Sequence, residues 1–424
     1  MDKVLTMLLA GGAGERLTPL TAHDAKPMMP FGGIYRLIDV TLSNCVNSGL
    51  TRVYILTQHK AFSLNRHIRE AWNILSPELG QFIEPLPPTR RLRQTWYLGT
   101  ADAVYQNIQS IVDERADHVL ILSADHVYKM DYSQMFDWHI ERGADVTVAT
   151  TLVAPEDAHR FGIVDIDADY VIRGFLEKPQ DGCHLRSRFN PGMCSASMGI
   201  YLFSAQVLLE ALVDDARTAN STHDFGKDVL PRLTDRRRVV AYDFVDENKK
   251  DVRYWRDVGT LDSYYEANMD LVAVHPVFNL YDPEWPLRTV NPRLPPAKFV
   301  FADEGRRMGV ALDSLISHGC IISGGRVTRS ILSPGVRVNS YSTVEDSILF
   351  PGVQIGRSSI VRRAIVAQNV RIPDHSEIGV DIEANRRQGH VVTESGIVIV
   401  HAGSPGVSVA PTLSLLPAVR AARG

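Results

Sequence analysis

The feature that most constrains the fold is an internal repeat of 17 residues in the last third of the chain. An aliphatic residue recurs at intervals of six, six and five residues through four repeats, and each of these twelve positions is Val, Ile or Leu. They are Leu315, Ile321, Val327, Leu332, Val338, Val344, Leu349, Ile355, Val361, Val366, Ile372 and Ile378. Stacked coils with three short strands each predict a parallel β-helix built on hexapeptides. A β-sandwich with coincidental spacing would not hold this register over four repeats.

The chain before the repeat has a different pattern, in which short apolar runs alternate with helical periodicity. The runs that we interpret as strands are 53–56, 119–122, 146–151, 200–203 and 239–244. This alternation predicts a mainly parallel sheet covered by helices. We therefore expect a first domain at residues 1–280.

Five prolines between the two patterns exclude regular helix and predict a linker at residues 281–300. They are Pro283, Pro286, Pro292, Pro295 and Pro296. The β-helix domain is expected at residues 301–402. A C-terminal tail rich in Pro, Ser and Ala is expected at residues 403–424.

Composition excludes several functional classes. A formal net charge of −4 on 424 residues offers no general attraction to nucleic acid. No apolar run reaches membrane-spanning length, and because an apolar run begins at Val4 we expect no leader peptide. Four cysteines show no metal-ligand spacing, which favours a reduced intracellular protein. We expect a cytoplasmic protein with no nucleic-acid or membrane partner.

A glycine-rich turn, Gly11-Gly12-Ala13-Gly14-Glu15-Arg16, directly follows the apolar run 4–9. Such a turn exposes backbone N–H groups to an anion and lets a phosphate approach the main chain. The turn matches neither a P-loop nor a dinucleotide fingerprint, and an ordinary strand-to-helix turn stays possible. Two nearby cations, Arg16 and Lys26, favour a phosphate site.

Two aspartates are candidates for holding a divalent cation. Asp125 follows the apolar run 119–122, at the strand end where open α/β sheets bind ligands. Asp257 lies in Tyr254-Trp255-Arg256-Asp257-Val258-Gly259-Thr260. Two carboxylates plus phosphate oxygens are a usual magnesium site in nucleotide enzymes. A turn or a helix N-cap is the alternative for each aspartate.

Two lysines, Lys26 and Lys178, each precede a proline. A following proline disfavours helical backbone, so both lysines are expected in extended backbone that limits the reach of the side chain. Glu177 and Lys178 form either a surface ion pair or a site for a sugar hydroxyl and a phosphate.

These residues belong to longer segments that resemble bacterial ADP-glucose pyrophosphorylases over nearly all of residues 4–400. The glycine-rich turn is shared by all sugar-1-phosphate nucleotidyltransferases. The more specific segments are Trp96-Tyr97-Leu98-Gly99-Thr100-Ala101-Asp102-Ala103, His223-Asp224-Phe225-Gly226-Lys227-Asp228 and the segment 254–260.

The resemblance implies a fold and a reaction. The fold is a Rossmann-like nucleotidyltransferase domain with a mainly parallel sheet, followed by a left-handed parallel β-helix for regulation and assembly. The reaction joins ATP and α-D-glucose 1-phosphate into ADP-glucose, with release of pyrophosphate, for glycogen synthesis. The phosphate of the sugar attacks the α-phosphorus in line, so no covalent nucleophile is needed.

The resemblance also implies roles for individual residues. Asp125 and Asp257 hold Mg²⁺, and Arg16 and Lys26 stabilise the triphosphate and the leaving pyrophosphate, so Arg16, Lys26 and Asp125 are the expected catalytic residues. The residues expected around the adenosine are Gly11, Gly12, Gln58, Gly99, Thr100, Ala101 and Asp102. Those expected around glucose 1-phosphate are Tyr97, Gly162, Glu177, Lys178, Ser197 and Asp224.

Regulation and assembly are implied in the same way. The family is usually a homotetramer under allosteric control. Several members place a lysine directly after Phe-Gly-Gly to contact an activator phosphate, but Ile34 stands there in this chain. An anionic effector is then expected at Arg36, Arg52, Arg386 or Arg387, at the junction between the domains.

Three other interpretations stay open. The first is a nucleotidyltransferase that uses another base, and the second is a non-catalytic regulatory subunit. Retention of Asp125, Arg16, Lys26 and Lys178 argues against the second. The third is a β-helix acyltransferase, although His318 and His375 occupy different positions in their coils.

Overall fold

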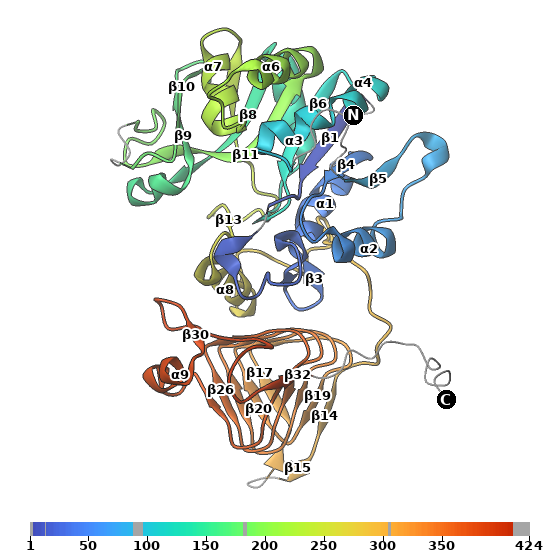
Figure 1. Ribbon diagram of the computed structural model, residues 1–424, viewed down its shortest axis with the longest axis vertical. Helices are drawn as coiled ribbons and strands as arrows, with labels where there is room; N and C mark the ends of the chain where they lie inside the picture. The colour runs from blue at the N-terminus through green and yellow to red at the C-terminus, as the bar shows by residue number, and fades with distance from the viewer. Residues whose placement is uncertain (1–2, 13, 88–95, 181–184, 304–306, 410–424) are drawn as a thin grey trace. The chain divides into compact units, whose positions relative to one another are not determined.

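The computed structural model describes residues 3–12, 14–87, 96–180, 185–303 and 307–409. The chain divides into two compact units, which are described separately (Figure 1). The first comprises Met1–Met29, Arg36–Gly259 and Val277–Val290, and the second comprises Pro30–Tyr35, Thr260–Pro276 and Asn291–Gly424. Each unit is therefore assembled from segments that are separated in the sequence.

The first unit is built around a nine-stranded sheet in the order β10-β9-β11-β6-β1-β4-β5, with β8 beside β11 and β12 beside β8. Its strands are β1 Val4–Leu9, β4 Arg52–Leu56, β5 Phe82–Leu86, β6 His118–Ser123, β8 Val146–Val153, β9 Gly162–Ile166, β10 Ile172–Glu177, β11 Cys194–Ser204 and β12 Val239–Asp243. A separate antiparallel pair joins β7 His126–Tyr128 to β13 Trp255–Asp257.

The sheet is mainly parallel, but β10 and β11 run opposite to its other strands. Strands β5, β4, β1 and β6 run parallel, and so do β8 and β12, whereas β11 pairs antiparallel with both β6 and β8. The predicted strands at 53–56, 119–122, 146–151, 200–203 and 239–244 are all present. The mainly parallel, Rossmann-like sheet is confirmed, and the reversed strands β10 and β11 add antiparallel pairs to it.

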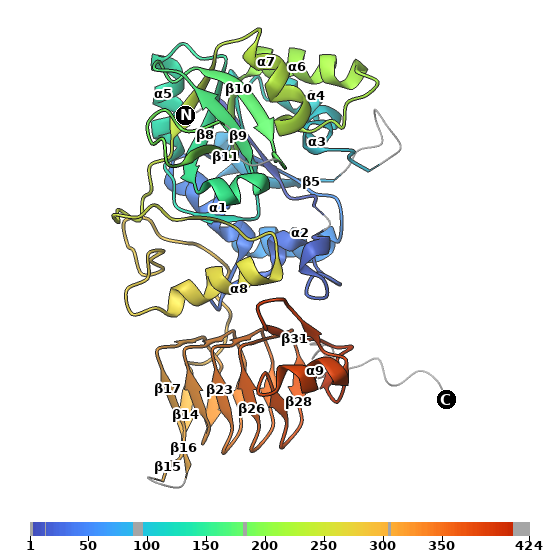
Figure 2. The same ribbon diagram turned by 90° about the vertical axis from the view of Figure 1, so that its left-hand side faces the viewer.

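Helices cover both faces of the sheet because successive residues of a strand point to opposite sides. Leu8 belongs to a core cluster with residues of α1 Leu37–Asn47, α2 Ala61–Ala71 and α5 Tyr132–Glu141. Leu5 and Met7 belong to a second cluster, whose helical residues come from α3 Thr100–Gln106, α4 Ile108–Asp113, α6 Ala205–Arg217 and α7 Leu230–Thr234. Figure 2 shows these two helical layers from the side.

The second unit contains stacked coils whose strands form three parallel ladders (Figure 2). The first ladder contains β14 Lys298–Val300, β19 Ile321–Ser323, β22 Arg337–Val338, β25 Gln354–Ile355 and β28 Val370–Ile372. The second contains β17 Val310–Leu312, β20 Arg326–Thr328, β23 Thr343–Glu345, β26 Ile360–Arg362 and β29 Glu377–Ile378. The third contains β18 Leu315–Ile316, β21 Ile331–Leu332, β24 Ile348–Leu349, β27 Ala364–Val366 and β31 Val398–Val400.

Shorter elements complete the second unit, and one of them, β3, ends on Arg36 of the first unit. They are β2 Pro30–Phe31, β3 Tyr35–Arg36, α8 Leu261–Met269, β15 Ala302–Asp303, β16 Arg307–Met308, α9 Ile382–Gln388, β30 Val391–Val392 and β32 Ser408–Val409. Ten of the twelve predicted inward positions, from Val327 to Ile378, are buried. Eight of these ten are at most 1 % exposed, so the predicted hexapeptide β-helix is confirmed with a dry aliphatic core.

The predicted register is wrong in the first coil. Ile316 pairs with Leu332, and Ile322 pairs with Val338, so these residues and not Leu315 and Ile321 continue the inward rows. Ile322 is fully buried, whereas Ile321 is only half-buried. A one-residue shift moves a strand's side chains to the opposite face. The shift cannot be seen in the sequence, because Leu315-Ile316 and Ile321-Ile322 are both aliphatic pairs and either residue of each pair could point inward.

The shift has a cause at one corner of the coil. Ile322 precedes Val327 by five positions, whereas Val338 precedes Val344 by six. The shorter corner contains Gly324, whose φ is +71°, and Gly325. A Cβ on Gly325 would lie 2.8 Å from the carbonyl oxygen of Asn339, so only glycine fits this tighter turn.

The cysteines differ in state. Cys45 and Cys320 are buried free thiols, but Cys194 at the start of β11 is disulfide-bonded. The expectation of reduced cysteines is therefore wrong for Cys194, because isolated cysteines without a motif give no spacing from which a pair can be predicted. Within the described ranges, no helix has both the length and the apolar character needed to cross a membrane.

Candidate active site

Three neighbouring parallel strands bring the predicted site residues to one edge of the first unit's sheet. Leu9, the last residue of β1, lies opposite Leu56 of β4 and Ser123 of β6. The residues that follow these three strand ends are Gly11 and Gly12, Gln58, and Asp125. The carboxyl ends of parallel strands share one edge, so residues from three distant segments meet there.

The glycine-rich turn passes close to the end of β4. A Cβ on Gly11 would lie 3.1 Å from the Cβ of Gln58, whereas a Cβ on Gly12 would meet nothing within 4 Å. Gly14 adopts φ +67°, and its carbonyl accepts a 2.8 Å hydrogen bond from the Thr21 hydroxyl. Gly11 therefore permits close packing, and Gly12 leaves space beside the backbone where a phosphate can approach. Ala13 lies outside the described residues.

The two predicted aspartates meet around Lys26. Strand β13 pairs with β7 so that Asp257 lies opposite His126, and this brings Asp257 next to Asp125. The Nζ of Lys26 lies 2.6 Å from Oδ2 of Asp125 and 3.8 Å from Oδ1 of Asp257. The lysine is 8 % exposed. The structure therefore brings together three of the residues predicted for phosphate chemistry.

Electrostatics keep the central carboxyl group ionised. Burial raises the pKa of Asp125, but the Lys26 ammonium, the His126 ring and a hydrogen bond from the Ser123 hydroxyl together outweigh it. That hydrogen bond joins Ser123 Oγ to Asp125 Oδ1 at 2.5 Å. The net effect holds the pKa of Asp125 well below its usual range, so Asp125 is negatively charged at neutral pH.

The donor set suits a divalent cation. One oxygen from each aspartate and one ring nitrogen of His126 lie within 4.8 Å of one another. Two carboxylates, Asp125 in the turn before β7 and Asp257 at the end of β13, leave further coordination positions for phosphate oxygens, which is the arrangement that Mg²⁺ prefers. The residues present therefore fit the predicted magnesium ion.

Arg16 lies beside the same centre. It belongs to a short 3-10 turn, Glu15–Leu17, that follows the glycines. A Cβ on Gly259 would lie 3.0 Å from Nη2 of Arg16 and 3.2 Å from both carboxylate oxygens of Asp257. The absence of a side chain at Gly259 lets the guanidinium approach the acidic centre.

An open pocket of about 420 Å³ adjoins Asp125 at this edge of the sheet. Its lining includes most of the residues predicted for the nucleotide. These nucleotide residues are Gly11, Gly12, Gln58, Gly99 and Thr100. Tyr97, Asp125 and Asp224 from the other predicted sets also line the pocket. The remaining lining residues are Leu9, Leu56, His59, Ala103 and Ser123. Its size falls within the range of small-molecule sites.

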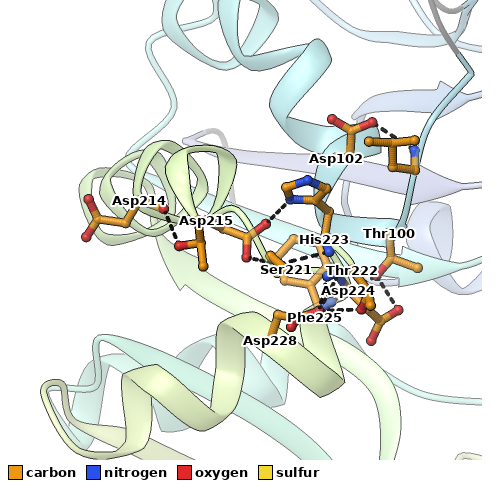
Figure 3. A network of polar contacts seen from close by, with 12 residues as sticks. Thr100, Asp102, Asp214, Asp215, Ser221, Thr222, His223, Asp224, Phe225 and Asp228 are labelled. Carbon is orange, nitrogen blue, oxygen red and sulfur yellow. Dashed lines mark hydrogen bonds and ion pairs between the residues drawn. The ribbon is translucent and has the colours of Figure 1, made fainter.

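Gly99 joins this pocket to the loop that precedes α7. A Cβ on Gly99 would lie 2.3 Å from the carbonyl oxygen of His223 and 2.5 Å from that of Thr222. The N–H of Ala101 donates to His223, and the Thr100 hydroxyl donates to Asp224. Figure 3 shows that Asp215 in turn supports His223 and Ser221. The loop is therefore fixed on both sides.

Two residues predicted for the nucleotide lie behind the pocket wall. Ala101 is fully buried, and Asp102 is 3 % exposed. The Asp102 carboxylate accepts hydrogen bonds from the Leu98 N–H at 2.9 Å and from Gln106 at 2.7 Å. In this structure Asp102 therefore orders the turn that carries Gly99 and Thr100.

The residues predicted for the sugar phosphate gather at the end of β10. Glu177 pairs across the sheet with Gly162, and a Cβ on Gly162 would lie 2.8 Å from Oε2 of Glu177. Nζ of Lys178 lies 3.1 Å from Oε1 of Glu177, with 61 % of the lysine side chain exposed. The expectation of extended backbone is wrong for both lysines. Lys26 begins the 3-10 helix Lys26–Met28. Lys178 has φ +47°, and its N–H donates to the Phe161 carbonyl.

The remaining predicted sugar-phosphate residues are held in place by nearby groups. The hydroxyl of Tyr97 accepts a hydrogen bond from Asn107 at 3.0 Å, and burial raises the pKa of Tyr97, so it stays protonated. Ser197 is 7 % exposed and accepts from the Gly199 N–H. The Asp224 carboxylate accepts from the N–H groups of Gly226 and Lys227.

The four candidate effector residues are distributed over both units. Arg36 and Arg52 belong to the first unit and Arg386 and Arg387 to the second. Arg52 donates to the carbonyl of Glu114 at 2.7 Å and also to its carboxylate. Arg386 donates to Glu383 at 2.8 Å within α9. Arg52 is thus already engaged by a carboxylate.

Sequence reasoning missed three residues near the site. His126 follows Asp125 directly, and Nε2 of its ring lies 3.5 Å from Oδ1 of Asp125. His59 lines the pocket and stacks on Trp96 at 4.7 Å. The adjacency of His126 and His59 to Asp125 and Gln58 was an available signal. The third missed residue is His223. No signal in the sequence indicated its pairing with Asp215, because that pairing depends on the turn between α6 and α7.

Comparison with known proteins agrees with this geometry. Residues 5–273 match a family model described as nucleotidyl transferase, and residues 295–400 match one described as GlmU-like, C-terminal hexapeptide. A glucose-1-phosphate adenylyltransferase of Koribacter versatilis (strain Ellin345) is 57% identical over 401 residues, which cover 94% of this chain and 95% of the relative. One of Rhodopirellula baltica is 51% identical over 406 residues, covering 95% and 91%.

These matches extend over both units and include the segments that build the acidic centre and the pocket. Identity of about half or more over nearly the whole of both chains shows the family directly. The chain belongs to the glucose-1-phosphate adenylyltransferase family.

Proposed function

We propose that this protein transfers the adenylyl group of ATP to α-D-glucose 1-phosphate and releases pyrophosphate. The observation that carries the proposal is the cluster of Asp125, Asp257 and Lys26 beside a pocket lined by the glycine-rich turn. The names of the relatives supply the base and the sugar. The same cluster argues against a non-catalytic regulatory subunit.

The reaction needs alignment and charge neutralisation more than acid-base chemistry. An oxygen of the sugar phosphate forms a bond to the α-phosphorus of ATP, while the bond from that phosphorus to the oxygen bridging the β-phosphorus breaks. The attacking oxygen is already anionic, so no side chain has to remove a proton. The protein has to hold two anions together in line and to stabilise the leaving pyrophosphate.

The residues present can meet these needs. The turn around Gly12 would offer backbone N–H groups to the phosphates of ATP, and Arg16 and Lys26 would supply positive charge where pyrophosphate develops. Asp125 and Asp257 would hold Mg²⁺, which supplies charge neutralisation and orientation of the phosphates. Glu177 and Lys178 would bind a sugar hydroxyl and the phosphate of glucose 1-phosphate.

A pyrophosphate-release assay tests the proposal. The purified protein is incubated with Mg²⁺ and glucose 1-phosphate, and with ATP, UTP, dTTP or GTP in separate reactions. We expect release with ATP at a rate far above that with the other three nucleotides. Preferred use of UTP or dTTP would instead favour a nucleotidyltransferase for another base, and no release with any of them would contradict the proposed reaction.

Lys178→Ala should separate the two substrates. We expect the KM for glucose 1-phosphate to rise much more than the KM for ATP, because one charge-assisted contact worth about 1.5 to 3 kcal/mol is lost from the sugar phosphate alone. Steady-state kinetics with each substrate varied in turn measure the two constants. Lys249→Ala is a matched control, because Lys249 also forms an exposed ion pair with a glutamate, at 2.7 Å. Equal increases in both KM values would refute the role of Lys178.

The wider role rests on the family resemblance. We propose that the product serves glycogen synthesis in the cytoplasm, that a small anionic effector regulates the enzyme, and that the protein forms a homotetramer. Light scattering on the purified protein measures the mass directly, and a monomer of about the 47.1 kDa chain mass would contradict the tetramer.

A further inference from the structure

Lys26 lies where a cation between the two aspartates would lie. Its Nζ is 2.6 Å from Oδ2 of Asp125 and 3.8 Å from Oδ1 of Asp257. The lysine side chain is 10 % exposed, and those of Asp125 and Asp257 are 26 % and 20 % exposed. Interactions between charges that are largely withdrawn from solvent are screened much less than those at the surface. The ammonium therefore neutralises one of the two negative charges at close range.

The second carboxylate oxygen of Asp125 also has polar neighbours. Oδ1 of Asp125 accepts from Ser123 and lies 3.5 Å from Nε2 of His126, and that nitrogen lies 3.9 Å from Oδ1 of Asp257. A free divalent cation that approached the two carboxylates would have to displace the ammonium or lie beside it. Two cations within about 4 Å repel each other strongly in such a setting.

We infer that Lys26 occupies the cation position of the free protein, so that a divalent cation enters this site only together with a polyphosphate that draws the ammonium away. The inference rests on the proposed function, because it takes the polyphosphate to be the triphosphate of ATP. Lys26 therefore has two roles. In the free protein its ammonium neutralises the negative charge of the aspartates, and after ATP binds it contacts the phosphates.

The position of the lysine stem supports this exchange. A Cβ on Gly14 would lie 3.1 Å from the Cβ of Lys26, so the stem lies against the glycine-rich turn. Four flexible carbon–carbon bonds separate the backbone of a lysine from its ammonium. The ammonium can therefore turn from the aspartates toward phosphates held at the turn without any movement of the backbone.

Binding of Mn²⁺ to the free protein tests the inference without turnover. Free Mn²⁺ is measured by electron paramagnetic resonance during titration of the wild type, of Lys26→Gln and of Lys26→Arg. We expect Lys26→Gln to bind Mn²⁺ at least about tenfold more tightly than the wild type, because the competing charge is gone. Lys26→Arg keeps the charge and should show no gain. Mn²⁺ binding to Lys26→Gln that is no tighter than to the wild type would overturn the inference.

Lys3→Gln is the matched control. Lys3 lies next to the opposite end of β1 and pairs with Asp117 at 2.8 Å, so its loss also removes one charge and frees one carboxylate. Its Mn²⁺ affinity should equal that of the wild type. Thermal melting shows whether each variant is folded.

A second measurement needs only the wild type. After subtraction of the Mn²⁺ that α,β-methylene-ATP chelates in protein-free solution, Mn²⁺ should bind at least about tenfold more tightly when the analogue is present than when it is absent, because the triphosphate then engages Lys26. Equal Mn²⁺ affinity with and without the analogue would overturn the inference. The titrations of the free protein involve neither nucleotide nor sugar, so a failure of the proposed reaction appears in the pyrophosphate assay and leaves their outcome readable.

Discussion

Asp125→Asn should lower the rate of adenylyl transfer by roughly 10² to 10³-fold while the protein stays folded. Asparagine keeps the shape of the side chain, and it removes the charge that Lys26 contacts at 2.6 Å. The variant thereby loses a ligand for the divalent cation and the group that places the lysine. Pyrophosphate release under saturating substrates measures the effect.

Asp117→Asn provides the comparison for this substitution. Asp117 also pairs with a lysine, at 2.8 Å, but its side chain is 50 % exposed and far from the strand edge that carries the pocket. Its loss should leave the rate within a few-fold of the wild type, since exposed ion pairs contribute little. An Asp125→Asn enzyme that turned over within a few-fold of the wild type would contradict the metal-binding role of Asp125.

Gly99→Ala is expected to lower kcat/KM by about a hundredfold, because its methyl group would collide with the backbone of the loop at residues 222–223. The added Cβ would lie 2.3 Å from the carbonyl oxygen of His223 and 2.5 Å from that of Thr222, and real Cβ atoms do not come so close. The loop has to move away from α3, which breaks the contacts of Ala101 and Thr100 with it. A displacement of about 1 Å at a site can cost this much in rate.

The strand β10 offers a matched glycine. A Cβ on Gly174 would meet only the Cβ of Asp165, at an ordinary 3.6 Å, so Gly174→Ala should leave the kinetics unchanged. Both variants are compared by initial rates and by thermal melting. If Gly99→Ala matched Gly174→Ala in kcat/KM, the close approach of Gly99 to the loop would have no part in shaping the site.

The sequence predicted those parts of the molecule whose signal is local or periodic. Val327 to Ile378 identify the β-helix because one inward side chain per short strand repeats at fixed spacing. The one-residue register shift at Ile316 and Ile322 could not be predicted from the sequence, because each of these residues follows another aliphatic residue that could equally point inward. The reversed direction of β11 was hidden for a related reason, since a strand that is buried on both faces carries no pattern that shows its direction.

At the active site, too, local features could be predicted from the sequence, and contacts between distant segments could not. Asp125 could be placed from the strand directly before it, whereas its contact with Asp257 depends on the pairing of β7 with β13 across more than a hundred residues. Lys26 was predicted to meet phosphates, and its position between two aspartates needed the structure. The φ of +47° at Lys178 departs from the usual effect of a following proline, because the Phe161 carbonyl holds its N–H.

A competition experiment tests whether the enzyme selects ATP and depends on Asp125. Equal concentrations of ATP, UTP, dTTP and GTP are mixed with glucose 1-phosphate, Mg²⁺ and the enzyme. The sugar nucleotides formed at low conversion are then separated, identified and quantified by mass spectrometry. Their proportions give the ratios of kcat/KM among the four nucleotides. We expect ADP-glucose as the dominant product of the wild type and its near disappearance with Asp125→Asn. A dominant product with another base, or the same yield of ADP-glucose from the variant, would contradict this expectation.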